Sequence, residues 1–166
     1  MIKNNTPVLV GCGQVTQKIE NPEEAKDPLE LMKESSLIAI EDSTVNDLAS
    51  HIDTVTAVRF IFDSEGGKRP PFSIYSNPPK TLADKLGIVD AKTYNGPTGG
   101  NTPQYLINIL AEKITNGESD VALLSGAECF STMRKASRQG IKTGWGKDSG
   151  GERIDLGFEK AGGTEN

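Results

Sequence analysis

Apolar and polar residues follow one another along the chain in blocks that predict strands alternating with helices. Short runs of β-branched, aliphatic and aromatic residues bounded by glycine or polar turns are typical of buried strands. Longer segments whose apolar positions recur every three or four residues, behind a capping residue, predict helices. The strands predicted in this way span residues 7–13, 52–62, 91–96 and 120–126.

The predicted helices have recognisable start and stop signals. In residues 27–43, Asp27 is the expected cap, Pro28 stands at the first helical position, and Glu30 has the spacing of a capping box. Further helices are predicted at 44–51, at 77–86 with Gly87 as the stop, and at 102–116, which is apolar enough to be mostly buried.

Strands that alternate with helices favour βαβ units and a parallel sheet. The predicted fold class is therefore α/β, with a mainly parallel mixed sheet and helices on both faces. Residues 63–76 contain two glycines and two prolines and are expected to form a loop. Residues 140–166 contain eight glycines and little apolar periodicity, so they predict a tail that packs on something else.

Composition narrows the possible partners and the compartment. The net charge of −5 makes nucleic acid and anionic membrane surfaces unfavourable partners. No apolar run approaches the roughly 20 residues that span a bilayer, and no signal-peptide core precedes the first strand. The two cysteines have neither disulfide nor metal-site spacing, so we expect a cytoplasmic protein without a metal.

Isolated motifs give weaker indications. Residues 11–16, GCGQVT, begin like a dinucleotide-binding turn, but Thr16 replaces the third glycine, so a nucleotide-binding Rossmann-like domain remains an alternative. Cys12 and Cys129 are interpreted as core thiols, although Cys129 follows a strand end where ligands bind in open sheets. His51 is expected at a helix end as a solvated residue.

Five basic residues with no acid between them lie between positions 134 and 147. They fit either a solvated helix face or a small patch for a phosphorylated cofactor, and both interpretations stay open. The residues are Arg134, Lys135, Arg138, Lys142 and Lys147.

Residues 94–131, YNGPTGGNTPQYLINILAEKITNGESDVALLSGAECFS, carry a more specific pattern. The stretch resembles the thiolase family of acetyl-CoA acetyltransferases, in the branch related to the sterol-carrier-protein type of thiolase. Asn95 ends the strand before the turn, NGESD at 116–120 matches a turn of the family, and SGAECFS at 125–131 places Glu128 in register. The resemblance covers residues 6 to 140 and implies that the chain handles acyl-coenzyme A thioesters.

The chain departs from the family at the nucleophile. Counting back from the NGESD turn puts the family's catalytic cysteine on Gly100, and no cysteine lies between 13 and 128. We therefore expect no catalytic residue here, because glycine cannot form an acyl intermediate. The start of the following helix, capped by Asn101 or Thr102, is instead expected to bind the acyl group through its unpaired N–H groups. The predicted substrate-binding residues are Gly99, Gly100, Asn101, Thr102 and Glu128.

The resemblance also implies an organisation for the whole chain. Residues 1–140 would be a thiolase-like N-terminal βα domain, and residues 141–166 the Gly-rich start of a truncated remainder, without the family's C-terminal half. A homodimer through the strand at 91–96 is expected by analogy. Two functions stay open: the N-terminal part of an acyl-CoA acyltransferase, or a non-catalytic acyl-CoA-binding or scaffold protein.

Overall fold

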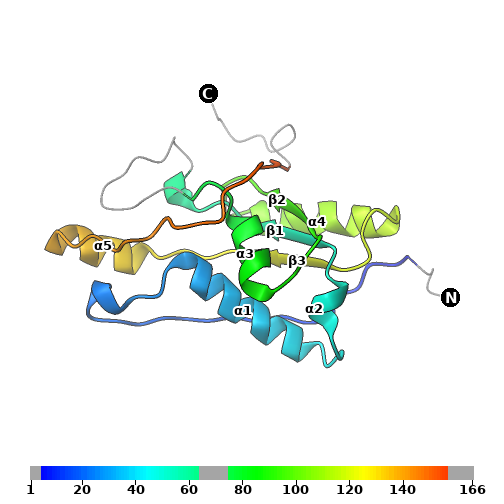
Figure 1. Cartoon of the computed structure of the whole chain (residues 1–166), viewed down its shortest axis with the longest axis horizontal. Coiled ribbons are helices and arrows are strands. Elements are labelled where there is room, and N and C mark those ends of the chain that lie inside the picture. Colours follow the sequence, from blue (N-terminus) through cyan, green and yellow to red (C-terminus); the bar gives the residue numbers. More distant parts are fainter. Residues whose placement is uncertain (1–4, 64–74, 157–166) are drawn as a thin grey trace.

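The computed structural model describes residues 5–63 and 75–156 (Figure 1). Within them the sheet has three strands, β1 (Thr54–Ala57), β2 (Lys92–Asn95) and β3 (Ala122–Ser125), in the order β2-β1-β3. Both pairings are parallel, and Thr54 stands opposite Lys92 and Ala122. The predicted α/β class is confirmed, and the described part of the sheet is parallel throughout.

Helices cover the two faces of this sheet. α1 and α3 pack against each other on one face, and α4 lies on the other (Figure 1). α5 extends from the end of β3 toward one end of the molecule. The bounds of the helices are α1 Pro28–Asp42, α2 Leu48–His51, α3 Pro78–Leu86, α4 Thr102–Thr115 and α5 Phe130–Gln139, with short 3-10 turns at Pro22–Glu24 and Ile61–Asp63.

The predicted caps position two of these helices. The side chain of Asp27 accepts a hydrogen bond from the Glu30 N–H at 2.8 Å, which starts α1. The side chain of Asn77 does the same for α3, and Gly87 ends α3 with a φ of 70°. The capping box is not closed, however, because the Glu30 carboxylate forms an ion pair with Lys85 of α3. That pair ties the two helices of one face together.

The strand predicted at 52–62 is shorter than its apolar sequence suggests. Only Thr54–Ala57 pair in the sheet, and the chain then turns into a 3-10 segment. Phe60 and Phe62 stack with ring centroids 5.3 Å apart, and Tyr75 packs against Phe60 at 5.2 Å. These three aromatic rings pack together in the core instead of extending the sheet, so aromatic packing ends the strand. The loop predicted at 63–76 lies mostly outside the described residues.

The strand predicted at 7–13 is wrong in the described structure. The segment is extended but pairs with no described strand, and it lies on α1 instead. A Cβ added to Gly11 would stand 2.1 Å from the Ala39 carbonyl oxygen, which shows how closely the two backbones approach. The Cys12 N–H also donates to the Asp42 carboxylate at 2.8 Å. Cys12 is exposed, so the expectation of a core thiol there is also wrong.

α4 is less buried than predicted. Of its 14 residues only Thr102, Leu106 and Leu110 are buried, and Ile107 is 49% exposed. The helix packs one narrow stripe on the sheet, and the side chains of Ile107, Ala111 and Ile114 line a cavity beside the outer edge of β3. The expectation of a mostly buried helix therefore fails because that flank has no cover among the described residues.

The described part of the tail packs on the sheet and on α3. Trp145 is buried in the core. Main-chain hydrogen bonds join Asn95 at the end of β2 to Ile154 and Leu156, at 2.8 and 2.9 Å. A domain boundary at residue 140 remains a prediction, while residues 145–156 contribute contacts to the fold described here. In the described ranges, no helix has the length and apolar character that crossing a bilayer requires.

Asp148 is expected to stabilise α3 from outside the helix. Its carboxylate accepts hydrogen bonds from the Ser76 hydroxyl at 2.8 Å and the Asn77 N–H at 2.7 Å, at the positive end of the helix dipole. Asp148→Ala should lower the free energy of unfolding by about 2 kcal/mol in urea titrations. Glu152→Ala is the control, because Glu152 contributes its main-chain carbonyl to Asn77. Equal stability of the two variants would contradict this role.

Candidate functional site

A cavity of about 590 Å³ opens at the carboxyl ends of the parallel strands, where ligands bind in open α/β sheets. Its walls come from three segments that follow β1, β2 and β3. They are residues 58–61 after β1, residues 98–103 at the start of α4, and residues 124–130 at the start of α5. The lining includes Gly99, Gly100, Pro103, Arg59 and Glu128.

Two glycines form the turn between β2 and α4. Gly99 has a φ of 155°, which side-chain-bearing residues rarely adopt, and a Cβ there would stand 3.1 Å from polar atoms of Asn101 and Thr102. Gly100 differs, because a Cβ built on it meets nothing within 4 Å. Gly100, on which the resemblance places the family's nucleophile, therefore faces open space at the cavity.

The start of α4 is built by its main chain. The Thr102 N–H donates to the Gly99 carbonyl at 3.1 Å, and the Tyr105 N–H donates to the Asn101 carbonyl at 3.1 Å. Asn101 occupies the cap position, but its side chain makes no capping hydrogen bond. The predicted side-chain cap is therefore wrong for Asn101, and the turn is closed by backbone groups.

The predicted substrate-binding residues separate into two groups. Gly99, Gly100 and Glu128 line the cavity, so the structure brings together residues about 30 positions apart in sequence. Asn101 is exposed and Thr102 is buried, and neither contributes to the cavity wall. These two residues shape the turn, and their direct contact with a ligand remains a prediction.

Glu128 is the acidic group of the cavity wall. One of its carboxylate oxygens accepts a hydrogen bond from the Ile61 N–H at 2.8 Å, which fixes the side chain across the end of β1. Partial burial raises the pKa of the Glu128 carboxyl, and the hydrogen bond from Ile61 opposes that rise. The Glu128 carboxylate can accept a hydrogen bond from a ligand as well as from the Ile61 N–H.

Arg59 was not predicted as a site residue. It is 9% exposed, lines the cavity, and lies 3.4 Å from the Asp155 carboxylate, which Arg153 also contacts. The signal was present in the sequence, because an arginine directly after an apolar strand is costly to bury without a partner. Its partner, Asp155, lies 96 residues further along and could not be inferred locally.

Thr98 adds a polar atom to the part of the cavity wall that residues 98–103 form. Its hydroxyl oxygen is buried and has no hydrogen-bond partner among the described residues, although buried hydroxyls are normally paired. A ligand group or an ordered water in the cavity would satisfy it. The sequence pattern indicated the neighbouring glycines as site residues but gave no signal for this threonine.

Cys129 is unsuited to nucleophilic chemistry. It is 6% exposed, and burial, together with the charges of Glu128 and Asp27, raises the pKa of its thiol to about 12. The expectation of a core thiol is confirmed at this position. His51 is exposed at the end of α2, as predicted. Across residues 5–63 and 75–156, His, Cys, Asp and Glu do not gather in any group of three that could hold a metal ion.

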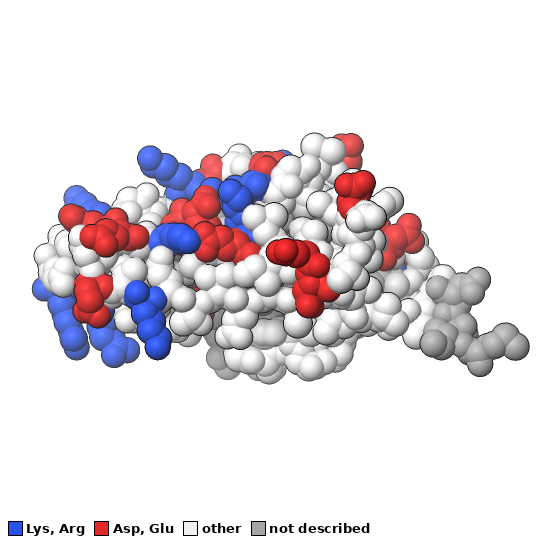
Figure 2. Space-filling model, turned by 90° about the horizontal axis from the view of Figure 1, so that it is seen from below, with Lys and Arg blue, Asp and Glu red and all other residues white. Residues whose placement is uncertain are grey.

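The basic residues after position 133 lie on and beyond α5, away from the cavity lining. Figure 2 shows Lys and Arg gathered at the end of the molecule where α5 lies in Figure 1. Lys135 bonds the Ile19 carbonyl at 2.5 Å and the Glu20 carboxylate at 3.1 Å. These contacts hold the segment before α1 against α5, which favours the structural interpretation of Lys135.

The segment GCGQVT does not have the geometry of a dinucleotide-binding turn. No helix opens at its glycines, since α1 starts at Pro28. Gly13 also lies on α1, where a Cβ would stand 2.1 Å from the Ser35 carbonyl oxygen. The backbone of this segment is therefore closed off by α1 rather than presented to a phosphate.

The chain was also compared with known proteins. No protein-family model matches it, and no curated protein is similar to it. A solved structure is similar: a monomeric SCP2-thiolase-like protein type 1 from Mycobacterium smegmatis, with 29% sequence identity and a TM-score of 0.57. The match covers 79% of this chain and 25% of that chain. This chain has a thiolase-like fold.

The fold predicted from the resemblance is thereby confirmed. This chain spans only a quarter of the neighbour's length.

Proposed function

We propose that this chain is part of a thiolase-like protein that binds an acyl-coenzyme A thioester, without a cysteine nucleophile on the chain itself. The acyl group would lie in the cavity at the carboxyl ends of β1, β2 and β3. The glycine turn before α4 would face its carbonyl oxygen, where the positive end of the helix favours partial negative charge. Thr98, beside that turn, and Glu128, on the wall that follows β3, would each supply a hydrogen bond to the ligand.

The observation that carries this proposal is the open position at Gly100. Gly100 lies in the lining of the cavity, and a Cβ there would meet nothing within 4 Å. A glycine with free space above it is compatible with a ligand that approaches the backbone closely. The thiolase-like fold supports the same proposal, because the turn at Gly99 and Gly100 and the SGAECFS segment that carries Glu128 both line this cavity.

The non-catalytic form of this function is favoured by a second observation. The one cysteine near the cavity, Cys129, is buried with its thiol pKa raised to about 12, so it holds its proton at neutral pH. Without a thiolate at this cavity, the covalent acyl-enzyme step of thiolase chemistry lacks its cysteine acceptor there. Acyl-CoA binding without carbon–carbon bond chemistry is therefore our preferred form of the proposal.

Titration calorimetry with acetyl-CoA tests the proposal. Wild-type protein should bind acetyl-CoA, and Gly100→Leu should weaken binding at least about tenfold because the leucine fills the space above the turn. Gln104→Leu on the exposed side of α4 is the matched control and should bind as wild type does. Equal binding by Gly100→Leu and Gln104→Leu, or no binding by the wild-type chain, would contradict the proposed site.

The homodimer expected through residues 91–96 is kept as a proposal about the outer edge of β2. Asn95 at the end of that strand already bonds Ile154 and Leu156, so a partner strand would have to pair with Lys92–Tyr94 or displace the tail. The structural neighbour is described as monomeric. The mass of the chain in solution, measured by light scattering, tests the dimer directly.

A further inference from the structure

A stripe of exposed side chains runs along α5 from the cavity at Gly100. Phe130, Arg134 and Arg138 stand four residues apart and therefore lie on one face of the helix. Phe130 is 47% exposed and lines the cavity, and both arginines are exposed. At 1.5 Å per residue the stripe is about 12 Å long. We call these three residues the α5 stripe.

The buried residues of α5 lie on another face of the helix. Thr132 and Ala136 are buried, and Lys135 binds the Ile19 carbonyl and the Glu20 carboxylate. These contacts hold the helix against the segment before α1. They leave the arginines of the α5 stripe exposed, so the stripe is a helix face that is available for another molecule.

The arginines of the α5 stripe carry charge that the described structure does not neutralise. Neither Arg134 nor Arg138 has an ion-pair partner among the described residues, and the same holds for Lys142, which follows the helix and is exposed. Lys and Arg side chains gather at this end of the molecule (Figure 2). The whole chain has a net charge of −5. An acidic partner is therefore attracted to this end and repelled by the remainder of the chain.

The shape of the α5 stripe favours a protein surface over a small anion. The arginines lie outside the cavity lining, on the convex face of a helix. Small ligands are usually enclosed by a concave site, whereas two guanidinium groups one helical turn apart match carboxylates with the same spacing on another helix. A long polyanion such as nucleic acid would extend over the acidic remainder of the chain. These features favour a compact acidic protein.

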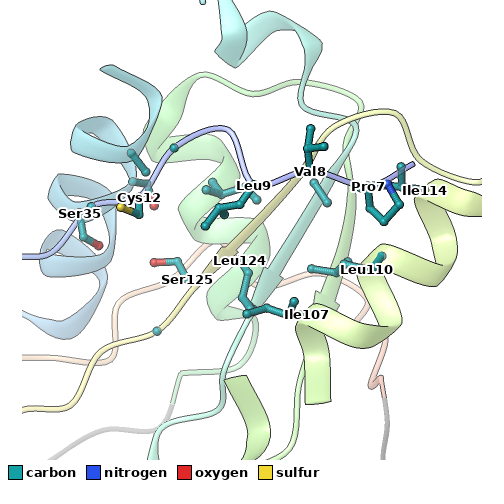
Figure 3. Close-up of a pocket in the computed structure, with 18 residues that line it drawn as sticks. Pro7, Val8, Leu9, Cys12, Ser35, Ile107, Leu110, Ile114, Leu124 and Ser125 are labelled. Atoms are coloured by element: carbon teal, nitrogen blue, oxygen red, sulfur yellow. The ribbon is translucent and has the colours of Figure 1, made fainter. Parts of the chain in front are cut away.

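A second cavity gives such a partner no comparable attraction. It has a volume of about 530 Å³ and lies between residues 7–13 and the outer edge of β3 (Figure 3). Its lining contains neither a charged residue nor any residue of α5. Charge therefore directs an acidic partner to the α5 stripe rather than to this cavity.

We infer that the α5 stripe docks an acidic helical protein that carries the acyl group as a thioester on its own flexible arm. The carboxylates of the partner's helix would pair with Arg134 and Arg138, while the arm passes Phe130 and places the thioester in the cavity beside Gly100. The partner is thus a protein-bound donor in addition to coenzyme A. This inference rests on the proposed function, because it assigns a donor to the same cavity.

The order of residues along the α5 stripe sets the orientation of the partner. Aromatic residues and arginine are enriched among the residues that carry binding energy in protein interfaces. Phe130 offers an apolar contact at the cavity end of the stripe, and the two arginines offer charged contacts further out. A partner with an apolar patch beside its arm and acids one or two helical turns away is held with the arm toward the cavity.

Titration calorimetry with acetylated acyl carrier protein, a small acidic helical protein, tests the inference. The wild-type chain should bind this probe, and added salt should weaken the binding. Arg134→Glu and Arg138→Glu should each weaken it at least about tenfold, whereas the affinity for acetyl-CoA should change by less than about twofold. Lys92→Glu makes the same change in net charge at an exposed position at the start of β2, and it should bind both ligands as wild type does.

The outcomes separate this inference from the proposed function. A wild-type chain that binds acetyl-CoA but not the acetylated carrier protein overturns the inference alone, and a chain that binds neither contradicts both. Equal weakening by Arg134→Glu and Lys92→Glu also overturns it, because net charge rather than the α5 stripe would then be the cause. Loss of acetyl-CoA binding in Arg134→Glu would mean that the stripe holds the phosphates of the coenzyme, which overturns it too.

Discussion

A cysteine introduced at Gly100 is expected to react about 1,000-fold faster than Cys129. The pKa of Cys129 is raised from an ordinary value of 9.0 to about 12, so its thiolate fraction at neutral pH is lower by about that factor. A thiol at position 100 would stand in open space at the start of α4, where the helix dipole lowers thiol pKa. The variant Gly100→Cys should be made with Cys12→Ser, because Cys12 is exposed.

Iodoacetamide alkylation followed by mass spectrometry measures this difference. Glu118→Cys in the same background supplies an exposed reference thiol away from the cavity. The Gly100→Cys thiol should react faster than this reference, because only the former lies at a helix N-terminus. Slow alkylation, similar to that of Cys129, would mean that the turn is closed and that Gly100 does not face a usable cavity.

The same variant tests the link to thioester chemistry. Incubation with acetyl-CoA should transfer one acetyl group to the introduced thiol, with coenzyme A released as the thiol, and Gly100→Ser should acquire none at a comparable rate. Acetylation of the Glu118→Cys reference at the same rate would show a general reaction of surface thiols. The site would then have no special affinity for the thioester.

The second large effect is expected at Gly11. A Cβ at this position would stand 2.1 Å from the Ala39 carbonyl oxygen of α1 and 3.0 Å from the nitrogen of Ser43, the residue that follows the helix. Both are backbone atoms, and moving either one would distort the end of α1. Gly11→Ala should therefore lower the free energy of unfolding by about 3 kcal/mol, or release residues 7–13 from α1. Urea titration reports the first outcome, and faster exchange of the Cys12 amide, which bonds Asp42, reports the second.

Gly100→Ala is the matched control for this substitution, because the added methyl group meets nothing within 4 Å and the backbone there is not left-handed. Its stability should lie within about 0.5 kcal/mol of wild type. A Gly11→Ala protein as stable as Gly100→Ala, with an unchanged Cys12 amide, would show that residues 7–13 do not rest on α1 as described.

Local signals predicted α1, α3 and α4 well because the determinants of these helices are local, whereas no helix was predicted over the residues of α5. Asp27 and Asn77 cap helices within three residues of themselves, and Gly87 ends one by its own conformation. The parallel pairing of the strands also followed from their alternation with helices, whereas the order β2-β1-β3 was not predicted. The cavity was predicted in part, since Gly99, Gly100 and Glu128 come together at the strand ends where the α/β pattern places ligands.

The errors arose where the outcome depends on distant parts of the chain. Residues 7–13 have the composition of a strand, yet their glycines fit against the backbone of α1 and the segment pairs with no strand in the described part of the chain. Phe60 and Phe62 favour a strand by propensity, but stacking with Tyr75 draws them into the core. Arg59 pairs with an aspartate 96 residues away, and no local sequence pattern indicates that pairing.

The contacts of residues 145–156 have a consequence for synthesis of the protein. Asp148 reaches the start of α3 and Ile154 reaches the end of β2, although both sites are translated many residues earlier. At about 5 to 20 residues per second, the ribosome would finish β2 several seconds before residue 154 is made. A nascent chain would expose that strand edge during this interval, so ribosome stalling late in the message should favour aggregation or chaperone capture.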